Sequence, residues 1–192
     1  RSKSELRNEI RATNPELAQR YEYYLEEIGL TAEEADLLTS DGSVSRLFED
    51  ALDVHHDAKV VANWVVNELS PYFENGKADA LPFGGAELGA LVALVASRTI
   101  SGKIGKEILA IIVREGGDPG AIVAERGLEQ VTDVSAVEPI VEQVIAANPE
   151  KVEEYRSGRT GLAGFFVGQV MREAGGTADP ELVQRLVREK LC

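Results

Sequence analysis

The chain has 192 residues, 44% of them hydrophobic, which is enough to bury one large or two small cores. Its net charge of −13 argues against a broadly basic nucleic-acid-binding surface, and it holds no run of about 18 apolar residues that would predict a membrane-spanning helix. The first twenty residues are too polar for a signal peptide, and the single cysteine, Cys192, cannot form an internal disulfide. We therefore expect a cytoplasmic protein, and the start at Arg1 indicates a piece of a longer polypeptide.

The acidic residues are concentrated in the first half of the chain. Residues 31–85 contain 11 acidic and 3 basic residues, whereas residues 86–192 contain 16 acidic and 12 basic residues. Phosphate binding needs a locally positive surface, so the sequence still allows a basic face on the second half.

Apolar residues recur at helical spacing almost throughout, and runs of period 2 bounded by hairpin turns are missing, so we predict an all-α fold. Four of the seven prolines follow Asn or Asp, which places a capping side chain before a proline at the first helical position. These pairs are Asn14-Pro15, Asp118-Pro119, Asn148-Pro149 and Asp179-Pro180. Gly29, Gly127 and Gly158 are predicted to end helices in the left-handed conformation.

In the first half, the pattern predicts helices over residues 4–13, 15–28, 32–38, 42–52 and 58–69. Thr31 and Glu34 form a predicted capping box, and Asp41 is a predicted cap. Residues 75–86 mix Gly and Pro without periodicity and are typical of a linker. We therefore predict an acidic helical domain over residues 1–80 and a second domain over residues 86–192.

In the second half, helices are predicted over residues 87–97, 102–115 and 118–127, and then over 136–146, 149–157, 161–173 and 179–191. A softer boundary near residues 132–135 divides this half into subdomains of about 86–132 and 133–192. Glycines interrupt the apolar stretch 158–172, although Gly inside a helix costs about 1 kcal/mol relative to Ala. We interpret Gly164 and Gly168 as close-packing positions and the turn at Gly158 and Arg159 as an edge open to an anion.

The second half also carries a series of motifs in one order. They are SGKIGKE at 101–107, GLEQVTD at 127–133, ANP at 147–149, YRSGR at 155–159, FFVGQVMR at 165–172 and ADPELV at 178–183. Over residues 86–192 the chain resembles the C-terminal tail of GatB, a subunit of bacterial glutamyl/aspartyl-tRNA amidotransferase, and the related YqeY-type domain. The first half is more weakly similar to the helical domain before that tail, through EEIGL at 26–30, DLLT at 36–39 and ANWVVNEL at 62–69.

This resemblance implies a tRNA-binding appendage used in making Gln-tRNA, with no catalytic or cofactor-binding residues of its own. The implied partners are tRNA, above all tRNA(Gln), which it would hold at the elbow, and the catalytic body of the parent enzyme, with neither DNA nor a membrane. A similar tail is fused to some bacterial glutaminyl-tRNA synthetases. The N-terminal flank favours that host slightly, because TNPELA at residues 13–18 stands where the amidotransferase family has a proline-rich entry.

The candidate RNA-binding residues are Lys103, Lys106, Arg156, Arg159 and Arg172. Lys103 and Lys106 lie three apart near a predicted helix start, where they either contact phosphate or are simply solvated. Arg156 falls in a predicted last helical turn, so the helix dipole is a competing explanation for it. The family tail usually has lysines at the positions of Gly161, Gly175 and Thr177, so positive charge is missing where RNA contacts are expected.

Other kinds of site find little support. His55 and His56 point about 100° apart on a helix and have no third ligand, so a metal site is not expected. We find no nucleophile with a neighbouring base, and Phe165 and Phe166 are expected in the core rather than against bases. The alternative to RNA binding is a docking adapter, whose acidic helices and glycine face would bind a partner subunit of such an enzyme.

Overall fold

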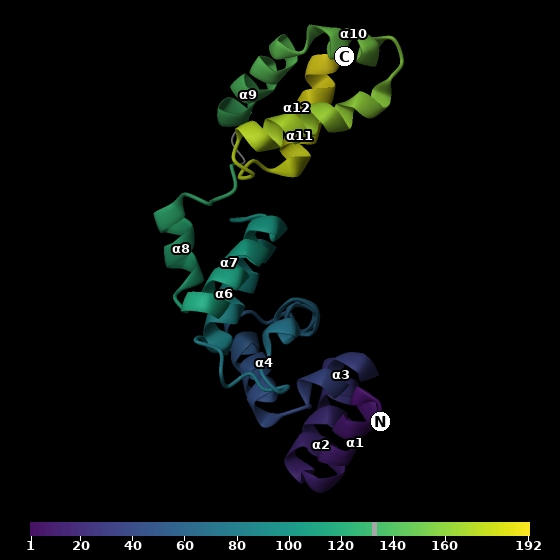
Figure 1. Ribbon diagram of the computed structural model, residues 1–192, viewed down its shortest axis with the longest axis vertical. Helices are drawn as coiled ribbons and strands as arrows, with labels where there is room; N and C mark the ends of the chain where they lie inside the picture. Colours follow the sequence, from purple (N-terminus) through teal and green to yellow (C-terminus); the bar gives the residue numbers. More distant parts are fainter. Residues whose placement is uncertain (132–133) are drawn as a thin grey trace. The chain divides into compact units, whose positions relative to one another are not determined.

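The computed structural model describes residues 1–131 and 134–192. Within these ranges the chain forms α-helices with short π- and 3₁₀-helical turns and two isolated β-bridges, but no strand, which confirms the all-α prediction (Figure 1). The described residues gather into two compact units. The first comprises Arg1–Ser97 and Gly105–Arg126, and the second comprises Arg98–Ile104 and Gly127–Cys192.

The two units do not follow the predicted division into residues 1–80 and 86–192. Residues 75–86 lie inside the first unit, because the helix that follows them packs against helices of the first half. The predicted softer boundary lies partly on residues 132 and 133, outside the described residues.

The helices lie close to their predicted positions. They are α1 (Lys3–Thr13), α2 (Pro15–Tyr23), α3 (Ala32–Leu38), α4 (Gly42–Val54), α5 (Ala58–Asn63), α6 (Gly85–Ala96), α7 (Gly102–Glu115) and α8 (Pro119–Arg126), followed by α9 (Val134–Ala147), α10 (Pro149–Arg156), α11 (Ala163–Glu173) and α12 (Pro180–Leu191). Two of these helices continue as π-helices: Tyr24–Ile28 follows α2, and Trp64–Leu69 follows α5. Short 3₁₀ turns form at Ser70–Tyr72 and Thr160–Leu162.

The first unit is centred on the crossing of α4 and α6, where two glycines allow the backbones to touch. A Cβ atom at Gly85 would lie 2.3 Å from the carbonyl oxygen of Leu47, and one at Gly89 would lie 2.7 Å from that of Ala51. Either distance is far below van der Waals contact, so only glycine allows this crossing.

The predicted close packing at Gly164 and Gly168 is wrong. A Cβ atom at either position would meet nothing within 4 Å, so both glycines lie on an open face of α11. The spacing Gly-x-x-x-Gly is the same at residues 85–89 and 164–168, and only the neighbouring helix distinguishes the two.

Two arginines join α1 to α3. Arg11 Nη1 lies 2.7 Å from Asp36 Oδ1, and Arg7 donates to Asp36 Oδ2 at 2.9 Å. Both Arg11 and Asp36 are buried, at 8% exposure each, and Arg11 is the one buried residue of α1. The attachment of α1 therefore depends on ion pairs more than on apolar contact.

Tyr24 joins α2 to α4 in the same unit. Its buried ring packs edge-on against Phe48, and its hydroxyl donates to Glu49 Oε1 at 2.9 Å. Burial, followed by the nearby negative charge of Glu49, raises the pKa of Tyr24 well above its ordinary value.

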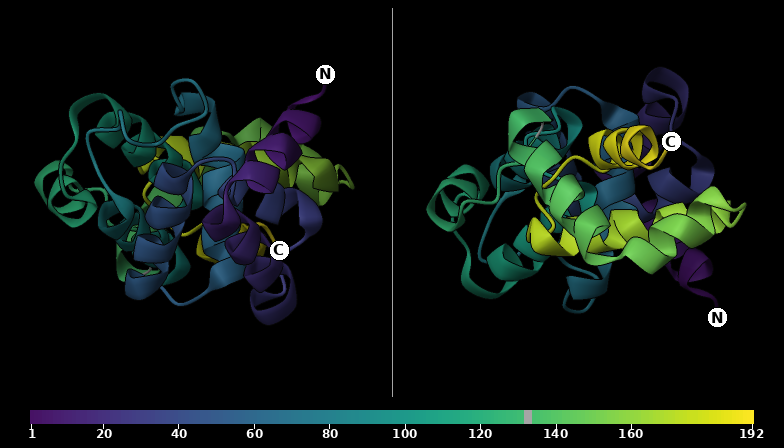
Figure 2. Two further views of the ribbon diagram at one scale, coloured as in Figure 1. Left: turned by 90° about the horizontal axis from the view of Figure 1, so that it is seen from below. Right: turned by 90° about the horizontal axis from the view of Figure 1, so that it is seen from above.

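In the second unit, α9, α11 and α12 pack against one another, with the chain's C-terminal helix α12 lying alongside the other two (Figure 2). Phe166, Val170, Val183 and Val187 are at the centre of their shared core. Asp179 caps α12 as predicted, accepting the Glu181 N–H at 3.1 Å. Asn148 does not cap α10, because its amide instead donates to the carbonyl of Val144 at 2.8 Å.

Candidate nucleic-acid interface

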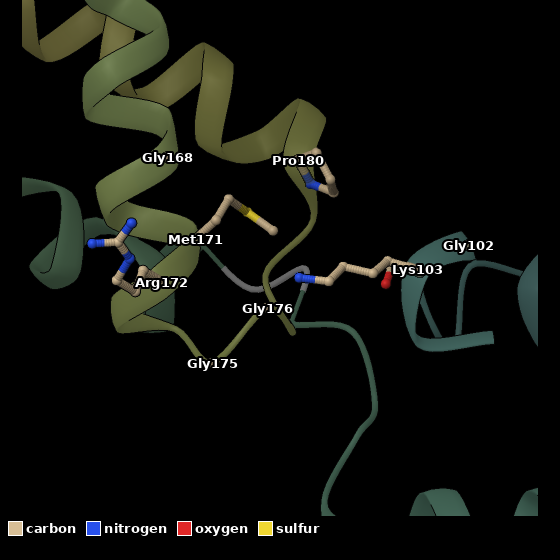
Figure 3. Close-up of a pocket in the computed structure, with 9 residues that line it drawn as sticks. Gly102, Lys103, Gly168, Met171, Arg172, Gly175, Gly176 and Pro180 are labelled. Carbon is tan, nitrogen blue, oxygen red and sulfur yellow. The ribbon is translucent and has the colours of Figure 1, made fainter. Parts of the chain in front are cut away.

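A hollow of about 640 Å³ lies in the second unit, and two of the predicted RNA-binding residues line it (Figure 3). The start of α7 contributes Ser101, Gly102 and Lys103, and α11 contributes Gly168, Met171 and Arg172. The turn after α11 and the start of α12 complete the lining, with Gly175, Gly176 and Pro180.

Ser101 fixes the start of α7 at this hollow. Its hydroxyl oxygen accepts the Ile104 N–H at 3.2 Å and so caps the helix, and Lys103 follows in the first helical turn. The Lys103 side chain is exposed and extends toward Met171 and Gly176 (Figure 3). No carboxylate of the described residues pairs with Lys103, so its full charge faces the hollow.

The turn after α11 is built from glycines in the left-handed conformation. Gly175 and Gly176 have φ angles of +67° and +76°, and the Gly176 N–H donates to the carbonyl of Met171 at 2.8 Å. From the sequence, Gly175 is notable only as a position where the family tail usually has a lysine. The structure adds that this turn lines the same hollow as Lys103, more than seventy positions earlier in the chain.

Arg172 is the second cation of the hollow. It is exposed in the last turn of α11, and within the described ranges it has no acidic partner. Its guanidinium lies on the opposite side of Met171 from the Lys103 ammonium (Figure 3). The two charges therefore flank the hollow and do not meet at one point.

The other three candidates are engaged elsewhere. Lys106 belongs to the first unit, where its ammonium lies 3.5 Å from Glu68. Arg156 donates to the carbonyl oxygen of Leu191 at 3.1 Å and so caps the end of α12. Arg159, predicted to form with Gly158 an edge open to an anion, pairs with Glu154 at 3.1 Å.

The two units differ in charge. The first contains 22 acidic and 11 basic residues, a net charge of −11, whereas the second contains 11 acidic and 9 basic residues, a net charge of −2. The hollow thus lies in the nearly neutral unit, where fewer negative charges oppose the field of Lys103 and Arg172.

Residues 1–131 and 134–192 provide no group of three His, Cys, Asp or Glu side chains that could hold a metal ion. Asp57, beside His55 and His56, accepts the Val60 N–H at 3.3 Å and caps α5. None of the described helices is both long and apolar enough to cross a bilayer.

The profile of the GatB domain family matches residues 46–191, which is more than half of the chain. The chain belongs to the GatB domain family. It is 46% identical over 180 residues to the GatB protein of the aspartyl/glutamyl-tRNA(Asn/Gln) amidotransferase of Rippkaea orientalis, covering 92% of this chain and 36% of the relative. It is 40% identical over 190 residues to the corresponding protein of the chloroplastic/mitochondrial glutamyl-tRNA(Gln) amidotransferase of Oryza sativa subsp. japonica, covering 98% of this chain and 35% of the relative.

This GatB domain thus spans about a third of the length of these relatives. The resemblance read from the motifs is confirmed. The match with the rice protein covers nearly all of the chain, including most of the flank that had favoured a synthetase host. That preference gains no support from these two relatives, which are both amidotransferase subunits by name.

Proposed function

We propose that this GatB domain is a non-catalytic tRNA-binding appendage of an amidotransferase that forms Gln-tRNA. The observation that carries the proposal is the hollow of the second unit, where Lys103 and Arg172 flank an open surface without acidic partners among the described residues. The names of its relatives, which refer to tRNA(Asn/Gln) and to tRNA(Gln), supply the class of RNA.

The arrangement suits phosphate contact better than base recognition. Lys103 and Arg172 are separated by Met171, so they would contact two phosphates along a backbone and not one (Figure 3). The free N–H groups at the start of α7 add a partial positive charge beside Lys103. Such contacts read RNA by shape, which fits a site at the tRNA elbow and gives tRNA(Gln) no base-specific code.

The proposal is tested by tRNA(Gln) binding to the 192-residue chain at several salt concentrations. Removing two phosphate contacts flattens the salt slope by about 1.4–1.8. We expect Lys103→Glu with Arg172→Glu to cause at least this change and to weaken binding. Arg185→Glu is the matched control, because Arg185 is exposed in the same unit and does not line the hollow.

Equal loss of binding in the Arg185→Glu control would show a diffuse charge effect and contradict the proposed site. Binding that is independent of salt, or no tighter than to a random RNA duplex, would contradict the proposed function.

The alternative is a docking adapter that holds a partner subunit with little direct RNA contact. It is favoured by the pairing of Lys106, Arg156 and Arg159 within the chain, which leaves two of the five predicted cations without an acidic partner in the part of the chain that the structure describes. It predicts that the Lys103 and Arg172 reversals leave tRNA affinity unchanged.

A further inference from the structure

The first unit contains a groove of about 790 Å³ along one face of α1. Lys3, Leu6, Arg7 and Ile10 line it from α1, at the spacing that places side chains on one side of a helix. Leu37 at the end of α3 and residues of the segment 70–77, including Phe73, line the remainder. All of these residues belong to Arg1–Ser97.

The lining of this groove includes exposed apolar side chains. Leu6 and Ile10 are each 44% exposed, and α1 buries no apolar side chain at all. Leu37 and Phe73 are only half-buried on the facing side. Since scattered single apolar residues are normal on a surface but a contiguous patch marks an interaction site, the grouping indicates a partner.

Two lysines also line the groove, although the unit as a whole is strongly acidic. Lys3 and Lys77 are exposed, and neither has an acidic partner among the residues the structure describes. Asp41 is the one acidic side chain in the lining, and it is occupied by the N–H and O–H of Ser43, at 3.0 and 2.6 Å. Lys3, Arg7 and Lys77 thus outnumber the single carboxylate, so the lining favours a negatively charged ligand, in contrast to the rest of its unit.

We propose that this groove binds an amphipathic helix of a partner protein, with apolar side chains along one face and Asp or Glu beside them. The apolar face would cover Leu6 and Ile10, while the carboxylates would pair with Lys3 and Lys77. This docking surface is separate from tRNA binding and does not depend on it.

The probe is a labelled helical peptide of about 16 residues with Leu at positions i, i+3, i+4 and i+7 and flanking Glu, titrated with the 192-residue chain by fluorescence anisotropy. A peptide with Lys in place of Glu and a scrambled peptide are the controls. We expect the acidic peptide to bind at least about tenfold more tightly than either control.

Two double variants, each with a control variant, test where the peptide binds. Leu6→Glu with Ile10→Glu is expected to weaken it about tenfold or more, whereas Tyr23→Glu, at a 53% exposed apolar position outside the groove, is expected to leave it unchanged. Lys3→Glu with Lys77→Glu is expected to abolish the preference for the acidic peptide. Arg46→Glu, an exposed cation of the same unit outside the groove, is expected to preserve that preference.

The proposal is overturned if the acidic peptide fails to bind, if the basic peptide binds as well, or if the Leu6 and Ile10 reversals have no effect. It is also overturned if sedimentation shows that the chain forms a dimer that the same reversals dissociate, because the occupant is then a second copy.

Discussion

The two units differ in how far they bury charged side chains. In the first unit, Arg11 and Asp36 are buried and hold one helix to another, and the backbones of α4 and α6 touch at glycines. In the second unit, the core is built from apolar side chains such as Phe166, and cations such as Arg172 remain at the surface. The net charge of a unit therefore does not show where a ligand binds. An arginine whose guanidinium is held in a buried ion pair cannot also pair with a ligand.

The largest expected effect tests the buried ion pair. Asp36→Ala leaves the buried Arg11 guanidinium without its counter-ion, which costs about 3–5 kcal/mol in free energy of unfolding. Urea unfolding followed by the fluorescence of Trp64, the single tryptophan, reports on the first unit, where it is 7% exposed. The control Arg98→Ala removes an exposed ion pair to Glu181 in the second unit and should cost under about 1 kcal/mol by circular dichroism. Similar losses of stability in the two variants would contradict the difference in buried charge between the two units.

Replacing one glycine of each pair by alanine gives the next largest expected effect. The change in stability has opposite signs in the two units. Gly85→Ala forces a methyl group against the backbone of α4 and should destabilise the first unit by about 2–3 kcal/mol. Gly164→Ala meets nothing within 4 Å and should stabilise α11 by up to about 1 kcal/mol. Thermal unfolding of both variants checks the pair. A stabilised Gly85→Ala variant would mean that α4 and α6 do not touch as described.

Tyr24→Phe should cost about 1 kcal/mol, since it removes one hydrogen bond to Glu49 but keeps the ring. Because the pKa of Tyr24 is raised on folding, its contribution is complete below the ordinary tyrosine pKa of about 10 and declines as the pH rises above it. The variant should therefore lose less stability than the parent chain between about pH 10 and 12. Parallel pH profiles for the two chains would show that Tyr24 does not titrate as proposed.

The smallest expected effect tests the difference in surface charge between the two units. Gly161 is exposed with open space around it, so Gly161→Lys fits and restores a lysine that the family resemblance places there. We expect tighter tRNA binding and a salt slope that is steeper by about 0.8. Ala124→Lys adds the same charge at an exposed position of the first unit and should change the slope less. An equal gain from both variants would favour a nonspecific charge effect.

Much of the fold could be predicted, because the side chains that cap a helix lie within a few residues of its ends in the sequence. Thr31 and Asp41 cap helices through side chains two or three residues from their backbone partners, so the sequence pattern was sufficient. Asn148 has the same local pattern, but a carbonyl of the preceding helix binds its amide instead. The candidate site was harder to predict, because the five cations look alike in sequence and the partners of Lys106, Arg156 and Arg159 lie at varied distances along the chain.

The sequence by itself determined the helical class, most helix boundaries and the family, since these depend on periodicity, capping and ordered motifs. Only the tertiary structure decided which glycines lie at a backbone crossing and which cations keep a free charge. Gly85 and Gly164 differ only in what packs beside them. Likewise Arg156 donates to a carbonyl 35 residues away, whereas Arg172 has no acidic partner among residues 1–131 and 134–192. Packing and pairing join residues far apart in the chain, which no local pattern encodes.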